Sequence, residues 1–139
     1  GDSRAVVCRK GQAVQLTVDH HPNIPAEKDR IVKAGGVVTI DNWGDSRVNR
    51  VLAVSRAIGD QPLQKFGVIA EPHLCTLRFT KDDSFLVFGS DGIFGPLRNQ
   101  EIVDIVTDYI RENGKKIDLQ VVAKKIVKKA ISMCLRADD

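Results

Sequence analysis

The chain has 139 residues, 42% of them hydrophobic, and a formal net charge of +3. This is the composition of one ordinary globular domain with a single core. No apolar run is long enough to cross a bilayer. Residues 1–113 carry 14 basic against 15 acidic side chains, and the basic excess lies in residues 114–139, with 7 against 3. A global cationic footprint is therefore lacking, and we expect neither a nucleic-acid nor a membrane partner.

Three scattered cysteines complete the composition: Cys8, Cys75 and Cys134. Their spacing matches no metal site, and each falls within an apolar pattern. We expect buried free thiols, which suit a reducing compartment and an intracellular protein of the cytoplasm or nucleus.

The first half of the chain predicts a hairpin followed by a helix. Residues 3–9 and 12–18 alternate between polar and apolar, and Lys10-Gly11 is a turn signal between them. Pro25 suits the first turn of a helix that runs to about Lys33, and Gly35-Gly36 ends it. A short strand follows at 37–40, then a polar loop at 41–50. Trp43 in this loop is expected to pack against the fold, and the alternative is that it covers the site or a substrate.

The second half predicts two strands and two helices. Residues 71–79 contain an alternating strand, and the apolar run 84–90 is typical of a strand covered on both faces. Asn99 is expected to cap a helix that ends at Gly114, and Asp118 to cap a last helix with one apolar and one lysine-rich face. The pattern predicts an α+β fold.

Aspartates next to predicted strands are the candidate functional residues. Asp91 follows the strand that ends in Gly89-Ser90, Asp2 precedes the first strand, and Asp138-Asp139 closes the chain. A carboxylate at a strand end can hold a metal ion rigidly. Asp-Gly pairs are also common in plain turns, and Arg56 could pair structurally with Asp60.

Taken together, these segments resemble the protein phosphatase 2C family of metal-dependent phosphatases. The similarity extends over essentially the whole chain. The segments that carry it are Gly1–Arg9, Val18–Pro22, Glu27–Val37, Leu52–Asp60, Glu71-Pro72, Phe88–Phe94 and Asn99–Asp104.

The resemblance implies a fold, a reaction and a metal site. The implied fold is an antiparallel β-sandwich flanked by helices in four layers, αββα. The implied reaction is hydrolysis of phosphoserine and phosphothreonine in phosphoprotein substrates, by a water activated at a two-metal centre of Mg²⁺ or Mn²⁺. The implied ligands of the two-metal centre are Asp91 and Asp139, with Asp138 as the competitor of Asp139, and Asp2 is implied to help hold a weaker third metal. Ser55, Arg56, Asp60 and His20 are expected to be structural.

Departures from the family pattern limit what this chain can do alone. The early Asp-Gly-His-Gly-Gly motif, the phosphate-binding arginine and the catalytic histidine find no match in it, and Gly95 stands where the family has an aspartate. We expect residues 1–139 to be part of a catalytic domain that lacks its N-terminal strands and its last strand, inactive by itself, with open sheet edges that favour self-association. A pseudophosphatase and a regulatory scaffold domain are the alternatives.

Overall fold

A computed structural model describes residues 1–137, and the side chains of residues 1–135. The chain forms two compact units. The first contains Gly1–Asp2 and Val18–Leu74, and the second contains Ser3–Thr17 and the chain from Cys75 onward. Strands and helices occur in both, so the chain is α+β.

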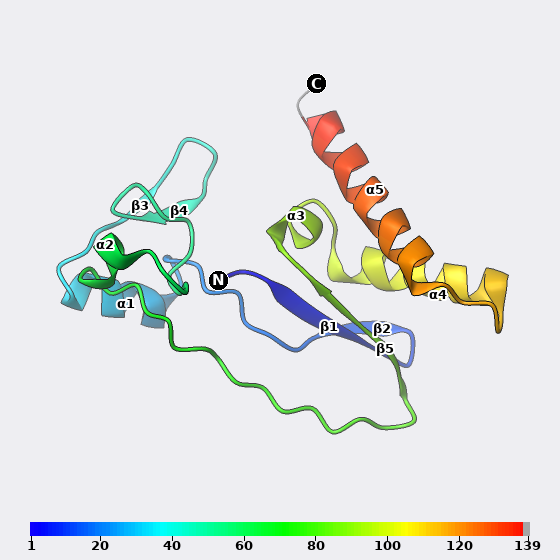
Figure 1. Cartoon of the computed structure of the whole chain (residues 1–139). Coiled ribbons are helices and arrows are strands. Elements are labelled where there is room, and N and C mark those ends of the chain that lie inside the picture. Colours follow the sequence, from blue (N-terminus) through cyan, green and yellow to red (C-terminus); the bar gives the residue numbers. More distant parts are fainter. Residues whose placement is uncertain (138–139) are drawn as a thin grey trace. The chain divides into compact units, whose positions relative to one another are not determined.

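An antiparallel sheet of three strands forms the centre of the second unit (Figure 1). Strand β1 (Arg4–Arg9) lies between β2 (Gln12–Gln15) and β5 (Asp83–Gly89). The β1–β2 hairpin is confirmed, and its turn places Lys10 and Gly11 at φ of 51° and 78°. In the second pairing Arg4 lies opposite Gly89. The start of β1 therefore lies beside the end of β5.

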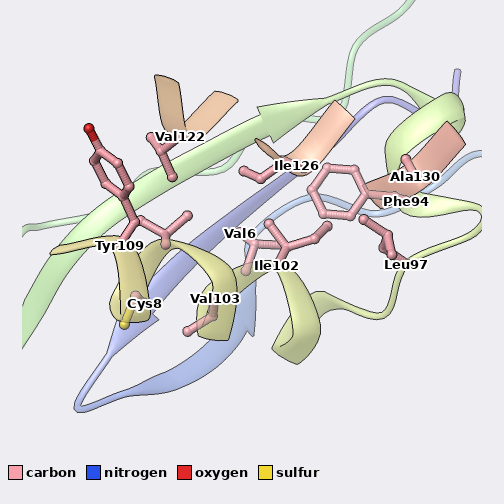
Figure 2. Packing of buried hydrophobic residues seen from close by; sticks show 11 residues of the cluster. Val6, Cys8, Phe94, Leu97, Ile102, Val103, Tyr109, Val122, Ile126 and Ala130 are labelled. Atoms are coloured by element: carbon pink, nitrogen blue, oxygen red, sulfur yellow. The ribbon is translucent and has the colours of Figure 1, made fainter. Parts of the chain in front are cut away.

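Three helices follow β5, and they are α3 (Asp91–Phe94), α4 (Asn99–Asn113) and α5 (Leu119–Ala137). The last two, α4 and α5, cover one face of this sheet (Figure 1). Alternate residues of β1 point toward the helices and join one core, shown in Figure 2. Its members are Val6, Cys8, Phe94, Leu97, Ile102, Val103, Val106, Tyr109, Val122, Ile126 and Ala130. Burying each large apolar side chain contributes about 1.5–3 kcal/mol.

The starts of α4 and α5 follow local hydrogen bonding. The backbone N–H of Arg98 donates to the Glu101 carboxylate at 2.8 Å, so Arg98 caps α4 and the prediction of Asn99 as the cap is wrong. The side chain of Asn99 instead accepts a hydrogen bond from Arg4. Asp118 accepts from the Gln120 N–H at 2.8 Å, as expected of the cap of α5.

The first unit consists of small elements around a second core. Helix α1 (Pro25–Lys33) has the predicted bounds, and Gly35 follows it at a φ of 79°. Strands β3 (Val38–Ile40) and β4 (Ser46–Val48) form an antiparallel hairpin, and α2 (Gln61–Gln64) is a single turn. Ile31, Val48 and Val68 are fully buried together. The predicted loop at 41–50 thus contains a strand, because Ser46–Val48 finds a hydrogen-bonding partner in β3.

Several predictions about strands and exposure are wrong. Residues 71–79 form no strand, because the part of the chain that the structure describes offers no neighbouring strand for their backbone. Strand β5 is covered by helices on one face, and Phe88 on its other face is 74% exposed. Cys8 is buried, whereas Cys75 and Cys134 are exposed. Trp43 is also exposed, so it does not pack.

Helix α5 has two apolar stripes where the sequence predicts one face. Val122, Ile126 and Ala130 are buried, whereas Val127 and Ile131 are exposed. None of the described helices is both long and apolar enough to cross a membrane.

Candidate metal-binding corner

Asp91 lies two residues beyond the end of β5, as the first residue of α3. Its side chain is exposed, and its Oδ1 accepts a hydrogen bond of 2.7 Å from the N–H of Gly92. Within the described residues, no other group bonds to this carboxylate. One oxygen is therefore fixed by the backbone, and the other is free to bind a ligand.

The corner around Asp91 is built from β1, β5 and α3. The Arg4 guanidinium lies 5.0 Å from the centre of the Phe94 ring and donates to Asn99 Oδ1 at 2.7 Å. Gly89 lies opposite Arg4, and a Cβ at this glycine would come within 3.0 Å of the Phe94 ring. Arg4 of the first predicted motif and Gly89 and Phe94 of the strand-end motif therefore meet here.

Asp2 belongs to the first compact unit and is half-buried. Its carboxylate makes no hydrogen bond or ion pair with another described residue. The preceding residue, Gly1, is held in place by a hydrogen bond, because its carbonyl accepts from the His20 N–H at 3.0 Å. Asp91 lies in the second unit, and the joint role of Asp2 and Asp91 stays a prediction. Asp138 and Asp139 lie outside the described residues.

These carboxylates suit a hard divalent cation by their chemistry. Mg²⁺ and Mn²⁺ prefer oxygen ligands, and Mg²⁺ often binds through one or two carboxylates while it keeps several waters. The free oxygens of Asp91 and Asp2 fit that role. Among the described residues, no three metal-ligating side chains gather into one cluster, so each carboxylate fits as part of a larger ligand set.

A buried ionic network organises the first unit. The carboxylate of Glu27 is 3% exposed and accepts two hydrogen bonds of 2.8 Å from Arg30 and one of 2.7 Å from Arg56. The Ser55 hydroxyl donates to it as well. Burial alone would raise the pKa of Glu27, but these donors outweigh it and hold the pKa well below its usual range.

This network corrects one interpretation and supports another. Arg56 pairs with Glu27 and not with Asp60, which is exposed at the start of α2. The Arg56 and Ser55 side chains thus connect α1 to the segment after β4. The sequence could not identify Glu27 as their partner, because a pairing across 29 positions leaves no local pattern.

His20 is buried beside this network. Its carbonyl accepts from both the N–H and the hydroxyl of Ser55, at 2.8 and 3.0 Å. Burial, and then the positive charge of Arg56, lower the pKa of His20 below its ordinary value of 6.5. These contacts agree with the predicted structural role.

Comparison with known proteins decides the family. The family model for "Protein phosphatase 2C" matches residues 1–136. This chain belongs to the protein phosphatase 2C family. Metal-dependent serine/threonine phosphatases make up that family, and Mg²⁺ or Mn²⁺ is its typical cofactor.

Curated relatives agree with this assignment. A rice "Probable protein phosphatase 2C 42" is 40% identical over 95% of this chain and 39% of its own length. "Protein phosphatase 1K, mitochondrial" of Xenopus laevis is 48% identical over 76% of this chain and 29% of its own length. The chain therefore spans about two fifths or less of the length of these phosphatase 2C relatives.

Solved structures show the same fold. A phosphatase from Toxoplasma gondii is 34% identical and superposes with a TM-score of 0.81 over 96% of this chain and 42% of its own. A sex-determining protein of C. elegans is 28% identical, with a TM-score of 0.85 over 96% of this chain and 32% of its own. The α+β arrangement of this chain thus matches part of larger phosphatase 2C structures.

Gly95 is the clearest departure from the phosphatase 2C pattern at the corner. Its N–H donates to the Asp91 carbonyl at 2.6 Å, and an added Cβ would lie 2.8 Å from that carbonyl oxygen. Because a real Cβ does not approach so closely, an aspartate here would require the α3 turn to shift.

Proposed function

We propose that this chain is the C-terminal part of the catalytic domain of a protein serine/threonine phosphatase. The proposed reaction is hydrolysis of phosphoserine and phosphothreonine in phosphoproteins at a two-metal centre of Mg²⁺ or Mn²⁺. The observation that carries the proposal is the carboxylate of Asp91 just beyond β5, whose second oxygen is free, in a chain that matches the phosphatase 2C family across residues 1–136.

In this proposal Asp91 and Asp139 are ligands of the two-metal centre, with Asp138 as the competitor of Asp139, and Asp2 helps to hold a weaker third metal ion. The Gly92 N–H orients Asp91 by holding Oδ1, so that Oδ2 faces the ligand. Bound ions supply a more acidic water and positive charge that offsets the charge of the phosphate. The buried His20 takes no part in proton transfer.

The proposed architecture is the four-layer αββα sandwich. The sheet face opposite α4 and α5 carries Val14, Leu86 and Phe88, and Val14 and Phe88 are exposed. A second sheet packed on this face would bury these apolar side chains and remove the free-energy cost of exposing them to water. Without it, the open edges of β2 and β5 favour self-association of the 139-residue chain. We place the protein inside the cell, in the cytoplasm or nucleus, which suits its three free thiols.

Gly95 favours a second candidate, a pseudophosphatase or regulatory scaffold with the same fold. The glycine removes a carboxylate next to the corner, and the tight approach of Gly95 to the Asp91 carbonyl leaves no room for another side chain. A scaffold would keep the fold and bind phosphoproteins without turnover.

Phosphate release decides between the two. The full-length protein that contains this chain is assayed on a phosphothreonine peptide with Mn²⁺, with Mg²⁺ and with chelator, and a phosphotyrosine peptide serves as the control. We expect metal-dependent release from phosphothreonine only, and no release by residues 1–139 alone. Absence of turnover by the full-length protein with either metal would support the scaffold. Turnover by the 139 residues alone would contradict the proposal that they hold only part of the active site.

A further inference from the structure

Helix α5 has a second apolar stripe that its own unit leaves uncovered. One stripe, which includes Ile126, enters the core of the second unit (Figure 2). The other consists of Val127, Ile131 and Leu135, which are 44%, 54% and 66% exposed. Because these three residues follow one another at intervals of four, their side chains form one ridge along the helix, called here the exposed ridge. A second helix packs on such a ridge by receiving it in a groove of its own surface.

Two lysines form one edge of the exposed ridge. Lys124 and Lys128 lie three positions before Val127 and Ile131, so each is a neighbour of a ridge residue on the helix surface. Both lysines are exposed, and neither forms an ion pair with a described residue. Lys125 differs, because its Nζ lies 3.8 Å from the Glu112 carboxylate. The ammonium groups at the edge of the ridge are therefore available to the carboxylates of a partner.

Charge and composition favour a separate protein as the partner. A second copy of this chain would bring more lysines to the contact, because residues 114–139 carry 7 basic against 3 acidic side chains. Helices that bind lipid surfaces bury a broad apolar face, often with aromatic residues. Helix α5 contains no aromatic residue, and its other apolar stripe is already used by the core. A narrow aliphatic ridge beside two cations suits an acidic helix better than a bilayer.

We propose that the exposed ridge of α5 docks an acidic amphipathic helix of a partner protein. The apolar stripe of that helix packs on Val127, Ile131 and Leu135, and two of its carboxylates, four residues apart, pair with Lys124 and Lys128. The choice of occupant follows from charge complementarity and from the spacing of the ridge. The docking uses neither Asp91 nor Asp2, so it does not depend on the proposed phosphatase activity.

Fluorescence anisotropy tests the docking on the full-length protein that contains this chain. The probe is a labelled, designed helical peptide with a leucine stripe and with glutamates four residues apart along one edge of that stripe. One control peptide replaces the glutamates by lysines, and another replaces the leucines by alanines, which preserves the helix. We expect saturable binding of the first peptide and at least about tenfold weaker binding of both controls. No saturable binding, or equal binding of the lysine peptide, would overturn the proposal.

Charge reversal on α5 tests the lysine edge. The double variant Lys124→Glu, Lys128→Glu should bind the acidic peptide about tenfold more weakly and the lysine peptide more tightly than the unchanged protein does. The matched control is Lys115→Glu, Lys116→Glu, the same charge change at two exposed lysines that precede the helix. It should leave both affinities within about twofold. A preference for the acidic peptide that survives reversal of the α5 lysines would refute their role.

Polar substitutions on the ridge test the apolar contact. Glutamine forms helices at least as well as valine or isoleucine, so Val127→Gln, Ile131→Gln should keep α5 intact and weaken peptide binding about tenfold. Leu119→Gln is the control, because Leu119 is 75% exposed but lies outside the ridge. Unchanged affinity in the ridge variant would contradict the docking. Binding of the full-length protein to phosphatidylserine vesicles without binding of the acidic peptide would overturn the choice of a protein partner.

Discussion

Replacing Glu27 by glutamine tests the buried ionic network of the first unit. The substitution keeps the shape of the side chain and removes its charge. Arg30 and Arg56 would then face a neutral amide, and at least one of their donors would lack an acceptor. Removing one partner of a buried pair costs about 3–5 kcal/mol. That is a large part of the roughly 5–15 kcal/mol by which whole domains are stable.

Hydrogen exchange localises this loss. Helix α1 carries Glu27, whereas α4 belongs to the other compact unit. A loss of about 3 kcal/mol would speed exchange of protected α1 amides roughly a hundredfold or more. Amides of α4 should change far less. Glu112→Gln is the matched control, since Glu112 is exposed and lies 3.8 Å from Lys125 in a surface pair worth about 0–1 kcal/mol.

The result that would refute this reasoning is specific. If Glu27→Gln changed α1 exchange no more than Glu112→Gln does, the Glu27 carboxylate would not anchor the two arginines. Ser55→Ala provides an intermediate case, because it removes one neutral donor to Glu27 and should cost about 1 kcal/mol.

Three further predictions concern other sites. Arg9 donates to Asp83 at 2.7 Å and lowers the pKa of that carboxyl to about 2 from 3.8. The Arg9–Asp83 ion pair should therefore stabilise the fold fully above about pH 4 and lose this contribution as the pH falls toward about 2. The difference in urea midpoint between wild type and Asp83→Asn should shrink over that interval. Gly67→Ala should destabilise the first unit by about 1–3 kcal/mol in thermal unfolding, because Gly67 has a φ of 90° and a Cβ there would lie 2.8 Å from the Ile31 Cα. Arg50 has a φ of 65°, so Arg50→Gly should raise the unfolding free energy by about 0.5–1 kcal/mol, since relief of this left-handed strain exceeds the added chain entropy. A lower melting temperature for this variant would contradict the strain argument.

Local signals in the sequence were sufficient for the short-range elements. Pro25 and Gly35 bracket α1, and Lys10-Gly11 marks the β1–β2 turn, because these residues restrict their own backbone. Strand β4 was missed because Ser46–Val48 has no strand pattern of its own and depends on β3 for its hydrogen bonds. Residues 71–79 show the reverse case, an alternating pattern without a described partner strand.

The site residues, too, could be predicted from the sequence only where the signal is local. The position of Asp91 at a strand end followed from the apolar run before it, although the structure begins α3 at that residue. The partner of Arg56 and the exposure of Trp43 depend on contacts between distant segments, which a single sequence does not reveal. The α5 stripe at Val127 and Ile131 has the helical period of a buried face but is exposed. Periodicity shows which residues share a face, and only packing shows which face is covered.

Asp91 provides the most direct test of the phosphatase proposal. Phosphate release from a phosphothreonine peptide is measured with Mn²⁺ for the full-length protein, for Asp91→Asn and for Asp60→Asn. Asp60 is the matched control because it is also exposed, directly precedes a short helix and makes no side-chain cap. We expect Asp91→Asn to lose at least about a hundredfold in rate while Asp60→Asn retains activity. Metal-dependent turnover that survives Asp91→Asn would contradict it.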